Sequence, residues 1–209
     1  MGITMTSPEI RLGVLILQDL QRTSNAAFGE SRSVFVNANQ ETFGVPLPTI
    51  RKLVIKHLKA YESGSEASLL EEEAMYLLEQ PVFDSKVAGI QILAALSEEQ
   101  VLVDTKTIKE VIKHTTGWAL VDTLATDVVA NILKNNPNEA ESLLDWVSSN
   151  DNWLRRCSIV SLIKAKDYIK DWARYKKLLL DQLAGESDPY VKKAIKWLNL
   201  WGILLTHKN

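Results

Sequence analysis

Apolar residues recur three or four positions apart along almost all of this 209-residue chain, a spacing that places them on one face of an α-helix. The first such series contains Ile10, Val14, Leu17 and Leu20. No stretch shows the sustained alternation of apolar and polar residues that is typical of a half-buried β-strand. The sequence therefore predicts an all-α fold.

The expected helices are short and are separated by polar turns. The first begins at Ser7, which can cap its N-terminus, with Pro8 at the first helical position. The next apolar segment ends at Gly44, and Pro46 and Pro48 then mark a turn before another helix. After the first helix, we expect helical segments over residues 32–43, 48–58, 69–79, 84–96, 105–114, 118–133, 139–147, 153–165, 169–183 and 189–204.

This rhythm of short helices indicates helix pairs stacked in a row. The pair spacing is close to the roughly 40 residues of a HEAT-type repeat. We therefore expect a right-handed superhelical solenoid of HEAT-like helix pairs, whose concave face forms a binding groove. No linker rich in Ser, Gly or Pro divides the chain, so residues 1–209 are predicted to form a single domain.

Composition narrows the class of protein. The apolar stretches are too short for a membrane span of roughly 20 residues, and the N-terminus lacks the basic and apolar regions of a secretory signal. The single cysteine, Cys157, excludes an internal disulfide and fits a reducing compartment. We expect a cytoplasmic protein that does not associate with membranes.

Charge is distributed unevenly along the chain. The formal net charge is −2, but residues 150–209 carry 12 Lys and Arg against 6 Asp and Glu, whereas the remainder carries 12 against 20. A basic C-terminal part can present a positive field to phosphate groups. A solvated charged face of a C-terminal helix would give the same composition, so charge alone leaves both readings open.

Several chemistries find no support in the sequence. His57, His114 and His207 lie far apart, with no Cys or carboxylate at metal-ligand spacing, so we expect no metal site. No Gly-rich phosphate loop is present, and no cofactor is expected. Cys157 follows Arg156 on a largely apolar helix face and is interpreted as a packing residue. The run at residues 71–73 is interpreted as a solvated acidic helix face.

Pairs of aromatic and charged residues at helical spacing are the candidate functional residues. Trp118 and Asp122 are four positions apart and share a helix face. Taken alone, this pair is more often a core tryptophan with its aspartate paired to a neighbouring helix. Comparable spacings recur further along the chain in the pairs Trp153 and Arg156, Lys193 and Trp197, and Lys192 and Lys196.

In combination, these segments resemble the AlkD-type DNA alkylation-repair glycosylases, which are built from HEAT-like repeats. The resemblance covers roughly residues 43–200 and follows the family order. It rests on Phe43-Gly44-Val45-Pro46-Leu47-Pro48, Ile50-Arg51-Lys52, Gly117-Trp118 through Val121-Asp122, Asn152-Trp153-Leu154-Arg155-Arg156 through Val160, and Val191-Lys192-Lys193-Ala194-Ile195-Lys196-Trp197. The chain departs from the family pattern at Gly117, at Ala119 and at Leu200-Trp201.

The resemblance implies excision of cationic N3- or N7-alkylated purines from double-stranded DNA, without flipping of the base. Asp122 would stabilise an oxocarbenium-like sugar, as in other glycoside cleavages. Trp118 and Trp197 would contact the deoxyribose through their ring faces. Arg156 would hold a flanking phosphate, and Lys192, Lys193 and Lys196 would attract the DNA backbone. A monomer is expected to suffice for this function.

Two alternatives remain open at this point. The chain could be a catalytically inactive HEAT-repeat protein that binds damaged or branched DNA and does not need Asp122. It could also be a protein-interaction scaffold with no role on nucleic acid, because helical solenoids serve many functions. The scaffold hypothesis predicts that Trp118, Arg156 and Trp197 point into separate parts of the core.

Overall fold

The computed structural model describes residues 11–31, 40–61, 67–98 and 103–206, with side chains described as far as residue 200. These residues form helices and connecting turns, and the described part of the chain contains no β-strand. The prediction of an all-α fold is confirmed. Within the described residues no helix is long and apolar enough to cross a membrane.

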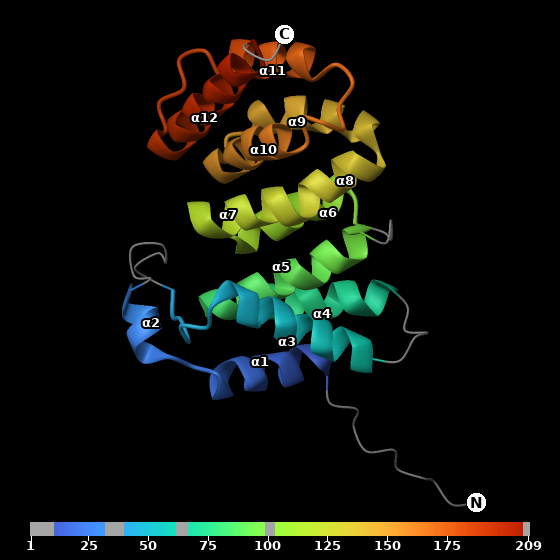
Figure 1. The fold of residues 1–209 in the computed structure, drawn as a ribbon, viewed down its shortest axis with the longest axis vertical. Coiled ribbons are helices and arrows are strands. Elements are labelled where there is room, and N and C mark those ends of the chain that lie inside the picture. The colour runs from blue at the N-terminus through green and yellow to red at the C-terminus, as the bar shows by residue number, and fades with distance from the viewer. Residues whose placement is uncertain (1–10, 32–39, 62–66, 99–102, 207–209) are drawn as a thin grey trace, which may run out of the picture.

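The helices stack in successive layers along the long axis of the molecule, from α1 near the N-terminus to α11 and α12 near the C-terminus (Figure 1). This arrangement is the predicted α-solenoid. The helix bounds are α1 Leu12–Arg22, α2 Ala26–Ser31, α3 Leu47–Ala60, α4 Ala67–Glu79, α5 Phe83–Glu98, α6 Thr105–Val111, α7 Trp118–Leu124, α8 Ala130–Asn135, α9 Ala140–Val147, α10 Asn152–Lys164, α11 Trp172–Gln182 and α12 Pro189–Thr206. That residues 1–209 form one domain stays a prediction.

Two helices hold the layers together. α5 packs against α3 and α4 on one side and against the α7–α8 run on the other. It is buried on almost every face, including its polar residues Asp84, Ser85 and Lys86. α10 packs against α7, α9 and α12. Because α10 contacts both α7 and α12, it brings together segments that lie about 70 residues apart in the sequence.

The expected helix over 118–133 is one run with an irregular centre. α7 passes into a π-helical turn, Ala125–Val129, and then into α8. A π-turn shifts the angular position of every residue after it and is common near functional sites. Here it follows directly after the segment that carries Trp118 and Asp122. Sequence periodicity predicted the length of the run but not this interruption.

The segment before α3 differs from the sequence-based expectation. Residues 32–39 and the expected start at Ser7 and Pro8 lie outside the described residues. Residues 41–43 are not helical, since Glu41 forms an isolated bridge with Val82. The short helix α2 was not predicted. The prediction of a helix over residues 32–43 is therefore wrong at its C-terminal end. There the backbone carbonyls of Glu41 and Phe43 accept hydrogen bonds from Phe83 N and Asn25 N instead of from a helical turn.

A buried carboxylate organises the turn that leads into α3. Asp84 of α5 is 0% exposed, and its oxygens accept hydrogen bonds from Thr42 Oγ1 at 2.7 Å, Phe43 N at 2.8 Å and Val45 N at 2.8 Å. Gly44 adopts a φ of +70°, in the left-handed region that favours glycine. The turn fixes where α3 begins, which places Leu47 opposite α7.

The acidic run in α4 is not uniformly solvated. Glu72 is exposed, but Glu73 is buried and accepts hydrogen bonds from Arg11 Nε at 3.0 Å and Gly13 N at 2.7 Å. It thus satisfies a backbone donor in the first turn of α1, which has no side-chain cap of its own. The interpretation of residues 71–73 as a solvated face is wrong for Glu73.

Candidate active site

Trp118, Asp122, Arg156 and Trp197 come from three different helices and meet at one place. Trp118 is the first residue of α7, and Asp122 lies one turn further along the same helix. Arg156 of α10 reaches Asp122 with two parallel hydrogen bonds, Nε to Oδ1 at 2.8 Å and Nη2 to Oδ2 at 2.7 Å. The Arg156 guanidinium lies over the Trp197 ring of α12, 5.1 Å from its centroid. The scaffold hypothesis predicted separate locations, and this convergence argues against it.

Arg156 is oriented toward the protein interior. Its side chain is 1% exposed, and its third donor, Nη1, bonds to the backbone carbonyl of Tyr190. Nε and Nη2 are both directed at Asp122. In this arrangement the guanidinium does not face solvent, so the phosphate contact expected from the sequence would require Arg156 or the groups that cover it to move.

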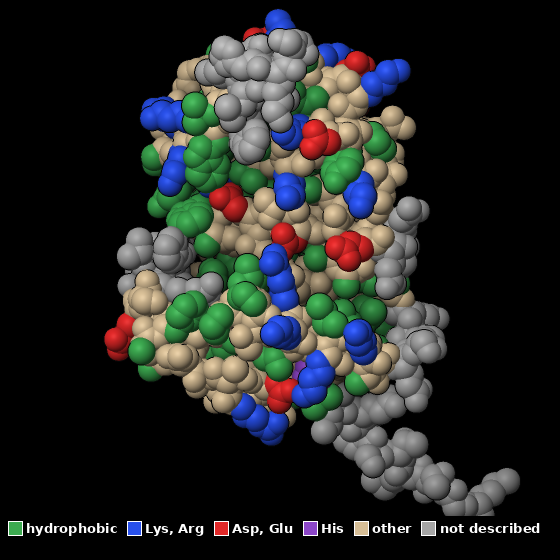
Figure 2. Space-filling view, in the orientation of Figure 1, with side chains coloured by type: hydrophobic (Ala, Val, Ile, Leu, Met, Phe, Trp, Pro, Cys, Tyr) green, Lys and Arg blue, Asp and Glu red, His purple; other side chains and the backbone are tan. Residues whose placement is uncertain are grey.

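The lysines expected to attract DNA lie on the surface of α12. Lys192, Lys193 and Lys196 are all exposed. Lys193 Nζ lies 5.8 Å from the centroid of the Trp118 ring and 5.6 Å from that of Trp197. Its ammonium therefore stands between the two aromatic rings. On the face shown in Figure 2, Lys and Arg side chains extend over successive helix layers with acidic side chains between them.

Asp122 occupies a partly desolvated position with cationic neighbours. Its side chain is 19% exposed. Burial raises the pKa of the Asp122 carboxyl above its usual value, while the hydrogen bonds and charge of Arg156, and the charge of Lys193, lower it; the net pKa shift is upward. A carboxylate in such a place interacts more strongly with a nearby developing positive charge than one in bulk water would.

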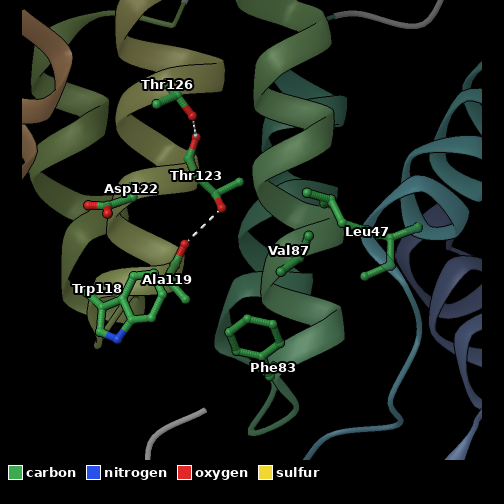
Figure 3. A pocket seen from close by; sticks show the side chains of 9 residues that line it. Leu47, Phe83, Val87, Trp118, Ala119, Asp122, Thr123 and Thr126 are labelled. Atoms are coloured by element: carbon green, nitrogen blue, oxygen red, sulfur yellow. Dashed lines mark hydrogen bonds between the residues drawn. The ribbon is translucent and has the colours of Figure 1, made fainter. Parts of the chain in front are cut away.

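A cleft of about 380 Å³ opens beside this group, between α7 and the helices α3 and α5. Figure 3 shows Leu47, Phe83 and Val87 on one side, facing Trp118, Ala119 and Thr123 on the other. The Asp122 carboxylate lies at its edge and points away from Phe83. The Thr123 hydroxyl is already used in a hydrogen bond to Ala119 O at 2.8 Å. Most of the other residues that line the cleft are apolar.

The residues of this cleft wall were not identified from the sequence. Leu47, Phe83 and Val87 are ordinary apolar residues at helical spacing, and nothing local distinguishes them from core residues. Tyr190 was also missed, because its contribution is a backbone carbonyl, and every residue carries one. Its ring packs against Trp153 in a tilted arrangement, with 5.1 Å between centroids and 42° between the ring planes.

Within the described part of the chain, the remaining reactive side chains do not form a second centre. Cys157 is fully buried, and this burial raises the pKa of its thiol to about 12. Its interpretation as a packing residue agrees with this position. Among the described residues, no three His, Cys, Asp or Glu side chains group as they would around a metal ion. His207 lies outside the described residues.

Residues 16–198 match a family model described as "DNA alkylation repair enzyme". The chain belongs to this family. The match contains all four converging residues, and it confirms the resemblance found in the sequence motifs. No curated protein sequence matches the chain. As a member of this family the chain is a DNA alkylation repair enzyme, which makes DNA its partner.

Proposed function

We propose that the chain is a monofunctional DNA glycosylase that hydrolyses the N-glycosidic bond of cationic N3- or N7-alkylated purines in duplex DNA. The observation that carries the proposal is the convergence of Asp122, one turn from Trp118 on α7, with Arg156, which pairs with Asp122 and lies over the Trp197 ring, within the region matched to the repair family. An alkylated purine of this kind already bears a positive charge and leaves readily. The enzyme therefore needs to stabilise the sugar and does not need to protonate the base.

Asp122 supplies the negative charge for this step. Loss of the base leaves an oxocarbenium-like sugar, and a fixed carboxylate near its anomeric carbon lowers the energy of that state. The same carboxylate can orient the attacking water. The low exposure of Asp122 strengthens the interaction, because little solvent screens it.

Trp118 and Trp197 contribute ring faces that attract cations. The Lys193 ammonium lies within 5.8 Å of both ring centroids. A site that holds an ammonium between two aromatic rings is suited to a cationic sugar as well. This contact acts through the backbone of the damaged nucleotide and leaves the base in the duplex, in contrast to enzymes that flip their base.

The test is the release of 7-methylguanine from methylated duplex DNA under single-turnover conditions. Asp122→Asn is expected to lower the rate by about a hundredfold to a thousandfold, the effect typical of removing one preorganised electrostatic group. Asp127→Asn is a matched control. Asp127 lies on the same helical run and is 20% exposed, but its carboxylate bonds to Arg51 of α3 at 2.7 Å and to Gln91 of α5 at 2.9 Å instead of to Arg156. Full activity in a folded Asp122→Asn protein would contradict the proposal.

One observation favours a second candidate, a DNA-binding member without catalytic activity. Both oxygens of Asp122 accept hydrogen bonds from Arg156, so the carboxylate is already paired within the protein. Salt-dependent binding to duplex DNA without base release from the wild type would support this candidate. The glycosylase proposal also includes the monomeric state and the cytoplasmic location expected from the sequence.

A further inference from the structure

Arg156 is a buried cation whose donors are shared among protein acceptors. Its Nε and Nη2 bond to Asp122 and its Nη1 to Tyr190 O, with the side chain 1% exposed. A buried charge is retained only where such partners compensate for lost hydration. With 1% of the side chain exposed, the two remaining N–H groups do not face solvent, so a DNA phosphate could reach Arg156 only if Asp122 or the first turn of α12 moved aside.

We infer that Arg156 is a positioning residue for Asp122 and does not hold a DNA phosphate. This inference rests on the proposed glycosylase function. The bidentate pair fixes the plane of the carboxylate, as only a planar guanidinium can. Because Tyr190 O anchors Nη1, the pair is also tied to the first turn of α12. The α12 lysines, which are exposed, remain as the phosphate-binding groups.

A carboxylate paired in this way still has capacity to act. Each oxygen carries two lone pairs, and Arg156 uses one on each. Asp122 retains 19% exposure, so part of the group faces the site. Arg156 therefore orients Asp122 without occupying all of it.

The same pair favours the ionised form of Asp122. The charged groups that act on Asp122 are Arg156 of α10 and Lys193 of α12, while α5 presents the apolar Phe83 and Val87 to the cleft on the other side of α7. Burial raises the Asp122 pKa, and Arg156 opposes that effect. Without Arg156 the pKa of Asp122 rises further. Since the ionised form is the active one, activity would then be lost at a higher pH as the solution is acidified.

The experiment combines pH–rate profiles with salt-dependent binding for three variants. Arg156→Lys keeps the positive charge but loses the two parallel donors of the planar guanidinium, and Arg156→Gln loses both the charge and this donor pair. Lys192→Gln is the comparison, since Lys192 is exposed on α12. Thermal unfolding of each variant checks that it is folded, and the conservative Arg156→Lys remains informative where Arg156→Gln is not folded.

The inference predicts a loss of rate at saturating protein for Arg156→Lys of roughly tenfold to a hundredfold, as expected for a misplaced catalytic group. Arg156→Gln should also move the acid limb of the profile to higher pH. Both should retain the wild-type salt slope of DNA binding, whereas Lys192→Gln should reduce that slope by about 0.9, the value for one phosphate contact.

A salt slope reduced by about one phosphate contact in the Arg156 variants, with an unaltered rate at saturating protein, would show a phosphate ligand and overturn the inference. Absence of base release from the wild type would instead refute the glycosylase proposal. In that case the positioning role falls with it. The two failures are therefore distinguishable in one set of measurements.

Discussion

Asp84→Asn is the sharpest test of how the fold positions the wall of the cleft. Asp84 is fully buried and accepts three hydrogen bonds from neutral donors on the turn before α3. Its Oδ2 accepts from Thr42 Oγ1 and Phe43 N, and its Oδ1 accepts from Val45 N. Asparagine keeps one acceptor oxygen and replaces the other with an NH₂ group, which cannot accept from Val45 N.

The expected cost follows from these contacts. A hydrogen bond to a charged group contributes about 1.5–3 kcal/mol, and a buried donor left without an acceptor adds a penalty of similar size. Because Asn can rotate to keep the better pair, we expect a loss of about 3 kcal/mol in the free energy of unfolding. Asp104→Asn is the matched control, since Asp104 accepts from Lys106 N and Thr107 N at the exposed start of α6. That cap should cost about 1 kcal/mol or less.

Urea unfolding monitored by circular dichroism measures both variants. With a slope of about 2 kcal/mol/M, the Asp84→Asn midpoint should fall by roughly 1.5 M. Hydrogen exchange should show the loss first at residues 42–45, where the three donors lie. An Asp84→Asn protein within about 0.5 kcal/mol of the wild type would refute the reasoning, since surface-like changes are of that size.

Two further predictions concern glycine conformation and thiol chemistry. Gly44→Ala should be much more destabilising than Gly185→Ala in thermal unfolding. Both glycines have a positive φ, so the backbone cost is shared. A Cβ added at Gly44 would lie 2.2 Å from Asn25 O, whereas a Cβ added at Gly185 would meet no atom within 4 Å. For Gly185→Ala we expect only the left-handed backbone cost of about 1–2 kcal/mol, and equal effects would contradict the argument. Cys157, with its thiol pKa raised to about 12 by burial, should resist thiol reagents in the native protein and react once it is unfolded. Rapid native labelling would show that the α10 core opens.

Much of the fold could be predicted from local patterns. Apolar spacing gave the helices, and Gly44 with Pro46 gave the break before α3, because each depends on a few neighbouring residues. The shared face of Trp118 and Asp122 likewise follows from their four-residue separation. These features concern one helix at a time, which is why the sequence contains enough information for them.

The contacts between layers could not be predicted in the same way. Asp84 and Asp122 are both aspartates early in helices, yet one binds a turn 39 residues before it and the other binds Arg156, 34 residues after it. The burial of Arg156 depends on how α7, α10 and α12 pack, and no local pattern contains that information. The resemblance identified Arg156 as functional, but only the stacked helices show what it contacts.

Arg155 and Arg156 show how strongly this packing determines a role. The two are adjacent in α10, where successive residues point about 100° apart. Arg155 bonds to Glu186, with Nε to Oε2 at 2.8 Å, and Glu186 in turn accepts from the backbone of Asp188 before α12. Arg156 bonds to Asp122 on the other side. Thus α10 is connected through one arginine to the turn that begins α12 and through the next to α7. Tyr190 O, just after that turn, also accepts a hydrogen bond from Arg156. A substitution at Glu186 that shifts this turn would therefore alter the position of Arg156, and through it that of the Asp122 carboxylate, although Glu186 does not bond to Asp122.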